Sequence, residues 1–241
     1  MANPILNSSF KPQENILEDE LMTVTGSTLK SIFLLSTIIL SSGYTWHLAA
    51  IGYSDKISIL MLMGLIIAFI TGLIVVCAKP KISPLLSVIY AISEGLFLGG
   101  LSAIYESSYH GIVGKAIFLT FIVTGTMLFL YVTKIIRMSE KLRSFILTAT
   151  ASIALIYLIQ IGASFFGRSI PAIFGAGTIG IGFSLFVISI AALNLIADFS
   201  IIEEGPKYRL PKVYEWVGAV GLMFTIVWLY LEILRLLSKR D

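Results

Sequence analysis

Carboxylates inside apolar sequence are the residues of this chain best suited to chemistry. Glu94 lies in YAISEGLFLGG, Asp198 in NLIADFSIIEEG, and Glu232 in WLYLEILRLL. A charge near the centre of a bilayer costs at least about 2.5–3.5 kcal/mol, so an acid within a spanning segment is by default a functional-site hypothesis. These acids indicate transport, proton sensing or regulation of another membrane protein.

Each acid also has a structural interpretation. Glu94, about 15 Å along its predicted helix, is either able to exchange protons or is a neutral acid hydrogen-bonded across helices. Asp198 and Glu232 are alternatively interfacial acids that face lipid headgroups, and Arg235 lies three positions after Glu232, close enough to pair. We interpret Glu215, beside Trp216, as an interfacial acid next to an indole of the aromatic belt.

The sequence lacks the residues that disulfides, metal sites and common enzyme mechanisms require. Cys77 is the single cysteine, which excludes a disulfide framework and a cysteine-based metal site. His47 and His110 have no second ligand at metal-binding spacing. The chain contains no Gly-x-Ser-x-Gly elbow, HExxH helix or phosphate loop. We therefore expect no metal, no cofactor and no enzymatic activity.

Composition indicates whether the helices that carry these acids lie in water or in lipid. The chain has 241 residues, of which 57% are hydrophobic and 13% charged, whereas a soluble domain has about 25% charged residues. Mean hydropathy is +0.94. So few charges cannot cover a soluble surface, and the bases separate apolar runs without forming a basic face. We predict an integral membrane protein that contacts lipid and does not bind nucleic acid.

Seven apolar stretches have about the 20 residues that a spanning helix requires. They are Ser31 to Ile51, Ile57 to Cys77, Pro84 to Tyr105, Ile112 to Val132, Phe145 to Phe166, Ile173 to Asp198 and Tyr214 to Leu237. This pattern predicts an all-α seven-helix bundle with short loops. Residues 1–29 form a polar N-terminal tail, and residues 30–241 form a single transmembrane domain.

Basic residues predict the orientation of these spans. Most Lys and Arg residues lie in the tail and in alternate loops on the same side, which favours a cytosolic N-terminus and an external C-terminus. A re-entrant last segment would instead place both ends inside.

Small residues at helical spacing predict close helix packing. These pairs are Gly95 with Gly99, Gly64 with Ala68, and Ala176 with Gly180.

Several stretches of the chain resemble the Bax inhibitor-1 family, and its bacterial branch in particular. They are Met22 to Ser36, Tyr90 to Glu106, Ile196 to Gly205 and Pro211 to Leu237. The run LYLEILRLL is the most specific of these matches. The resemblance implies a multi-pass protein of the bacterial cell membrane, with the last helix at the centre of the bundle and the other six wrapped around it.

The resemblance also implies a function. In relatives of known behaviour, acids on the sixth and seventh spans form a proton-sensitive latch, and opening allows a slow calcium leak. Asp198 and Glu232 match these acids, and Glu94 is a further protonatable group. Lys79 is the nearest residue to an Arg that those relatives place beside the latch. We thus expect a pH-sensitive cation leak channel whose partners are calcium ions, protons and lipid.

The alternative function is that of a non-conducting regulator. A different relative modulates a membrane-bound ATP-dependent protease, and the polar tail or the basic loops of this chain would then bind such a protease or another membrane complex.

Spacing leaves the contact between the two latch acids open. They are 34 positions apart, and Glu232 lies about 27 Å along a helix that begins at Tyr214, while Asp198 lies near the inner face. Straight helices would not bring them together. Either the last segment is shifted or partly re-entrant, or Asp198 pairs elsewhere, with Glu215 the nearest candidate by depth.

Overall fold

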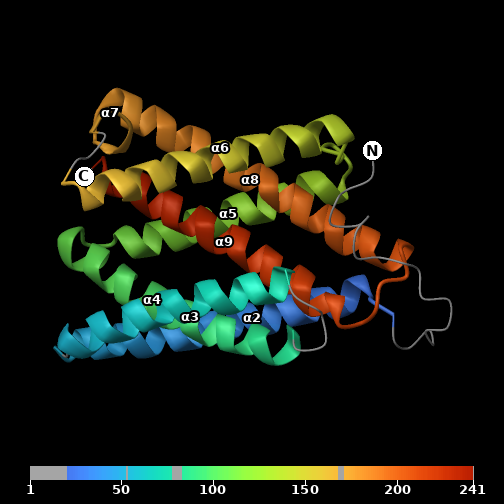
Figure 1. Ribbon diagram of the computed structural model, residues 1–241, viewed down its shortest axis with the longest axis horizontal. Helices are drawn as coiled ribbons and strands as arrows, with labels where there is room; N and C mark the ends of the chain where they lie inside the picture. Colours follow the sequence, from blue (N-terminus) through green and yellow to red (C-terminus); the bar gives the residue numbers. More distant parts are fainter. Residues whose placement is uncertain (1–20, 53, 78–82, 168–170, 241) are drawn as a thin grey trace. The chain divides into compact units, whose positions relative to one another are not determined.

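The structure, a computed structural model, describes residues 21–52, 54–77, 83–167 and 171–240. These residues are almost entirely helical (Figure 1). The helices are α2 (Val24–Ala50), α3 (Ser54–Cys77), α4 (Ser83–Ser108), α5 (Ile112–Val132), α6 (Glu140–Phe165), α7 (Pro171–Phe174), α8 (Thr178–Lys207) and α9 (Tyr214–Ser238).

Seven of these helices, all except the four-residue α7, are long and apolar enough to cross a membrane. The prediction of an all-α protein with seven spans is therefore confirmed. Within the described ranges, the β-structure consists of one isolated antiparallel bridge between Leu21 and Pro211. Helix α5 has the predicted bounds, and most of the other spans extend a few residues beyond the predicted ones.

The largest differences lie at the start of α2 and at both ends of α8, which continues to Lys207 and not only to the predicted Asp198. Helix α2 begins at Val24, before the predicted Ser31, because Thr23 caps it: the Thr23 backbone is extended and its hydroxyl oxygen accepts the Gly26 amide at 2.9 Å. Helix α8 begins at Thr178 and not at Ile173, because the glycine-containing residues 175–177 interrupt the helix after α7.

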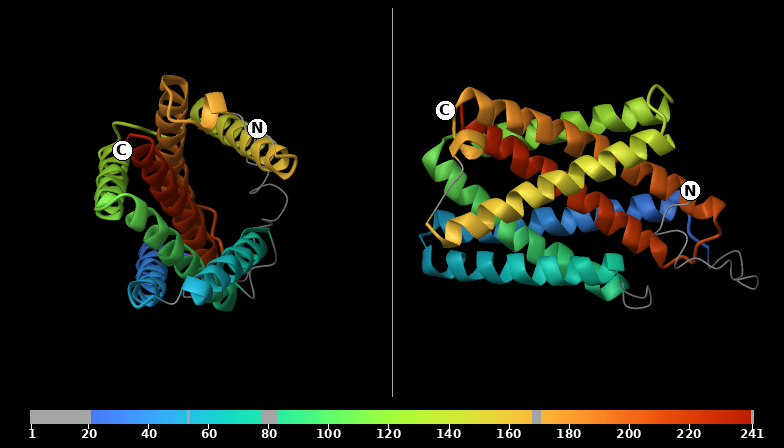
Figure 2. Two further views of the ribbon diagram at one scale, coloured as in Figure 1. Left: turned by 90° about the vertical axis from the view of Figure 1, so that its left-hand side faces the viewer. Right: turned by 45° about the horizontal axis from the view of Figure 1, so that its top comes forward.

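The chain forms two compact units. The first comprises the residues up to Leu101 together with Ser200–Met223, and the second comprises Ser102–Phe199 and Phe224–Asp241. In the first unit, α2, α3 and the first part of α4 run side by side (Figure 1). In the second unit, α7 lies at the end where α9 finishes (Figure 2).

Small residues allow close helix packing in the first unit, as predicted. A Cβ atom on Gly95 or Gly99 of α4 would overlap the backbone of α2, and one on Gly64 of α3 would lie 2.6 Å from the Ser93 carbonyl oxygen of α4. The predicted pair of Ala176 with Gly180 is wrong, because Ala176 lies between α7 and α8, outside any helix.

Burial differs between the spans. More than half of the apolar stretch of α4 and of α9 is buried, against about a tenth of that of α6. The exposed faces carry large apolar side chains such as Leu40, Phe118 and Leu147. These faces suit contact with lipid chains, and the burial of α9 agrees with the inner position that the family resemblance implies for the last helix.

Two basic residues after helix ends have left-handed backbones. Lys134 follows α5 with φ 59°, and Arg209 follows α8 with φ 52°. Side chains other than glycine are strained there by about 1 kcal/mol. We expect Lys134→Gly to raise stability by about that amount in thermal melting of the purified protein. Lys115→Gly, inside α5, should lower stability by up to about 1 kcal/mol; equal effects of the two changes would contradict this explanation.

Candidate functional site

Glu232 is the most fully enclosed acid of the second unit. It lies in α9 with 1% of its surface exposed. Its Oε1 atom accepts a hydrogen bond from the Tyr157 hydroxyl of α6 at 2.8 Å. Arg235 Nη1, one turn later on α9, lies 3.2 Å from Oε1 and 3.3 Å from Oε2, and it also donates to the Tyr157 hydroxyl oxygen at 2.7 Å. The three side chains therefore form a closed polar cluster that joins α6 to α9.

Asp198 lies in α8 and has a different partner. Its carboxylate accepts a hydrogen bond from the Thr225 side chain of α9. The other carboxylate oxygen, Oδ2, is buried and has no hydrogen-bond partner among the described residues. Burying a polar oxygen without a partner costs free energy, so this oxygen is a place where a proton, a water molecule or a cation would be stabilised.

The direct contact between Asp198 and Glu232 that a shared latch requires is therefore not formed in this structure. Thr225, which binds Asp198, precedes Glu232 by seven residues, or about 10.5 Å along α9. Of the alternatives left open by the sequence, the structure favours the one in which Asp198 pairs elsewhere. Its partner is the Thr225 hydroxyl and not a second acid.

An apolar cluster lies between the two acids. Ile153 of α6 and Val187 and Ile190 of α8 are at most 2% exposed, and Trp228 of α9 packs against them. Trp228 is three residues after Thr225 and four before Glu232, so the cluster occupies the level between the partners of the two acids.

A second polar pair lies on the Asp198 side of this cluster. The side-chain amide of Asn194, one turn before Asp198 on α8, donates to the Thr150 hydroxyl of α6 at 2.8 Å. Along the contact of α6, α8 and α9, polar groups therefore lie on both sides of an apolar layer.

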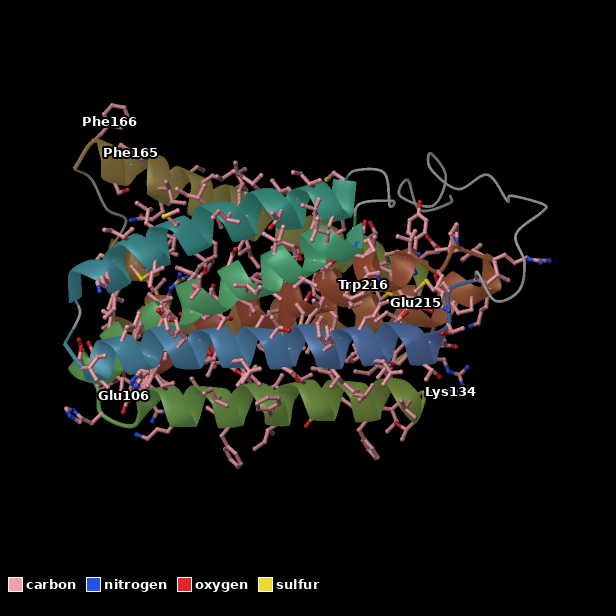
Figure 3. The ribbon with its side chains drawn as sticks, turned by 90° about the horizontal axis from the view of Figure 1, so that it is seen from below. Glu106, Lys134, Phe165, Phe166, Glu215 and Trp216 are labelled. Atoms are coloured by element: carbon pink, nitrogen blue, oxygen red, sulfur yellow. The ribbon has the colours of Figure 1, made fainter. Side chains whose placement is uncertain are left out.

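Glu215, the acid that was interpreted as interfacial, lies in the first unit and is fully buried. Its carboxylate accepts the Thr23 amide at 2.8 Å and the Thr23 hydroxyl at 2.9 Å, and it forms an ion pair with Lys30. Glu215 is therefore enclosed by residues of α2 and not exposed, and its interfacial depth stays a prediction. Figure 3 shows Glu215 and Trp216 at the start of α9, beside the first turns of α2.

Lys30 is the ion-pair partner of Glu215, and the sequence analysis did not predict this contact. Besides pairing with Glu215, it lies over the Trp216 ring, 5.3 Å from the ring centroid. Phe33 meets the same ring edge-on at 6.2 Å. The spacing of Lys30 and Phe33 by three residues on one helix face was an available signal, but their partners lie far along the chain.

The remaining predicted site residues have no part in the polar cluster of Glu232. Glu94 is buried in α4 with 8% of its surface exposed, and it belongs to the first unit. Lys79 lies outside the described residues. Among the residues that the structure describes, no group of three or more His, Cys, Asp or Glu side chains could hold a metal ion.

Comparison with known proteins places the whole chain in one family. No curated protein matches the sequence. A family model described as Bax inhibitor 1 like matches residues 3–241, which is nearly the full length, and the chain therefore belongs to the Bax inhibitor-1 family.

Proposed function

We propose that this protein is a pH-sensitive cation leak channel, that calcium is the conducted ion, and that protonation of intramembrane carboxylates controls it. The observation that supports this most is the enclosed Glu232 carboxylate, which joins α6 to α9 through Tyr157 and Arg235. Resemblance to the bacterial branch of the family further supports a location in the bacterial cell membrane.

Glu232 supplies the pH-dependent step of this mechanism. Its ionised form pairs with Arg235 and accepts the Tyr157 hydroxyl, so the charged state stabilises contact between α6 and α9. A proton on Glu232 removes the charge with which Arg235 pairs. Acidification should therefore weaken this contact and favour the open state.

Asp198 supplies a second protonatable group on the other side of the apolar cluster. Its unpartnered Oδ2 makes an ionised carboxylate costly unless a cation or water reaches it. A cation that passes the apolar cluster would therefore find a favourable oxygen ligand at Asp198. We assign Glu94, buried in α4, a further proton-exchanging role.

Flux measurements on reconstituted protein test this proposal. Calcium entry into liposomes is followed from about pH 8 down to about pH 5. We expect flux to rise on acidification for the wild type. Glu232→Gln, which retains the shape of the side chain without its charge, should raise flux at neutral pH and flatten the pH response. Asp198→Asn should also alter the response.

Glu203→Gln provides a matched control. Glu203 is an exposed acid of α8 that forms an ion pair with Lys207, one turn away on the same helix, so its neutralisation should leave the pH response unchanged. A flux that is independent of pH, or a Glu232→Gln variant that responds as the wild type does, would contradict the proposal. Liposomes with protein that pass no more calcium than protein-free liposomes would instead favour a non-conducting regulator.

A further inference from the structure

The end of α9 carries more positive than negative charge. Three bases, Arg235, Lys239 and Arg240, lie within the last residues that the structure describes, and Glu232 forms an ion pair with the first of them, Arg235. Glu106, another acid of the second unit, accepts the Gly111 amide at the start of α5. The α9 end is therefore suited to an anionic ligand.

Arg235 retains unused hydrogen-bond donors. Its hydrogen bonds to described residues all use Nη1, the atom that contacts Tyr157 and Glu232. The guanidinium lies over the Tyr157 ring, 5.0 Å from its centroid, and 37% of the Arg235 side chain is exposed. A guanidinium offers five N–H donors in a planar fork that matches a phosphate with two parallel hydrogen bonds. Because the side chain is partly exposed, the donors of Arg235 other than Nη1 suit a phosphate while Nη1 keeps its contact with Glu232.

Lys239 adds a charge whose hydrogen bonds, among the described residues, go to neutral groups, while the Glu232 carboxylate acts on it only through space. Its Nζ atom donates to the Gly180 carbonyl oxygen and to the Ser184 hydroxyl oxygen, each at 3.0 Å, and both acceptors are neutral. Partial burial and the neighbouring Arg235 guanidinium lower the pKa of Lys239. An anion bound between the two bases would favour the charged ammonium, which has three donors, and would offset this repulsion.

The position of Arg235 and Lys239 along α9 indicates which anion they can meet in a membrane. Helix α9 has 25 residues and is about 37 Å long, which exceeds a hydrocarbon core of about 30 Å. Its ends therefore reach the headgroup region. Arg235 lies three residues before the helix end at Ser238, and Lys239 directly follows it. Phe165 and Phe166, at the end of α6 in the same unit, are 85% and 84% exposed and suit the same boundary (Figure 3).

We propose that Arg235 and Lys239 form a binding site for the phosphate of an anionic phospholipid headgroup at the end of α9. The site shares Arg235 with the polar cluster of Glu232, but it uses donors of Arg235 other than Nη1 together with the ammonium of Lys239. Such basic sites between spanning helices suit anionic lipid headgroups.

Lipid-dependent thermal melting and lipid retention in native mass spectrometry test this site without measuring flux, so its failure and that of the leak are distinguishable. Phosphatidylglycerol should raise the melting temperature and remain bound, whereas phosphatidylcholine and inorganic phosphate should do so much less. Lys239→Gln retains a donor for Gly180 and Ser184 but removes the charge. It should weaken phosphatidylglycerol binding about fivefold, since one base near the surface contributes about 1 kcal/mol.

Lys207→Gln is the matched control. Lys207 is an exposed base at the other end of α8, where it pairs with Glu203, and its loss should leave lipid binding unchanged. Equal melting of Lys239→Gln and wild type in phosphatidylcholine checks that the variant folds. Unchanged phosphatidylglycerol binding by Lys239→Gln would overturn the site. Stabilisation by inorganic phosphate equal to that by the lipid would overturn the assignment to a headgroup.

Discussion

Gly26→Ala is expected to lower the melting temperature of the purified protein by on the order of 10 °C. A Cβ atom on Gly26 would overlap the carboxyl group of Glu215, which is fully buried and bound by Thr23 and Lys30. The carboxyl group would have to leave these partners. Separating a buried ion pair costs about 3–5 kcal/mol, because an uncompensated charge remains.

Two further variants test the cause of this loss. Gly43, also in α2, has open space where a Cβ atom would lie, so Gly43→Ala should be neutral or stabilise the helix by up to about 1 kcal/mol. In a double-mutant cycle, Gly26→Ala should cost little more once Glu215 is already alanine. Full additivity of the two changes would show that the overlap with Glu215 is not the cause.

Ile190→Ser is expected to raise calcium leak about tenfold or more at alkaline pH, where the wild type is closed. Ile190 is 2% exposed, and it belongs to the apolar cluster that lies between the levels of Thr225 and Glu232 on α9. Removing a large buried side chain costs about 2–5 kcal/mol. If the substitution destabilises the open state by about 1.4 kcal/mol less than it destabilises the closed state, the ratio of open to closed protein rises tenfold. Flux into liposomes measures this change.

Ile159→Ser is the control for a merely weakened protein. Ile159 is 52% exposed on α6, so a serine there changes a lipid-facing position and should leave the leak unchanged. The melting temperatures of both variants establish that the protein in the liposomes is folded. An Ile190→Ser variant that is folded and as tight as the wild type would show that this cluster is not the barrier.

Much of the fold could be predicted because lipid imposes simple rules on sequence. A spanning helix must be long, apolar and hydrogen-bonded within itself, and these requirements were enough to predict both ends of α5. The start of α8 could not be read in this way. Residues 175–177 are apolar enough to continue a span, and only the backbone shows that Gly180 lies against the Gly175 carbonyl oxygen.

The candidate site was predictable only in its local part. The pairing of Glu232 with Arg235 follows from a spacing of three residues on one helix. The partners on other helices do not follow from spacing. Tyr157 lies 75 positions from Glu232, and Lys30 lies 185 positions from Glu215. Such contacts depend on which helix faces meet, and hydropathy alone does not determine this.

The central claim is that protonation of Glu232 opens a cation path, and a pH jump on reconstituted protein tests it most directly. Calcium entry into liposomes is recorded as the outside solution is acidified from about pH 8 to about pH 5, for the wild type and for Glu232→Gln. The account predicts that wild-type entry rises on acidification, whereas Glu232→Gln is already raised before the jump and changes little. Entry that is unaffected by acidification in the wild type, or equally pH-dependent in both proteins, would contradict it.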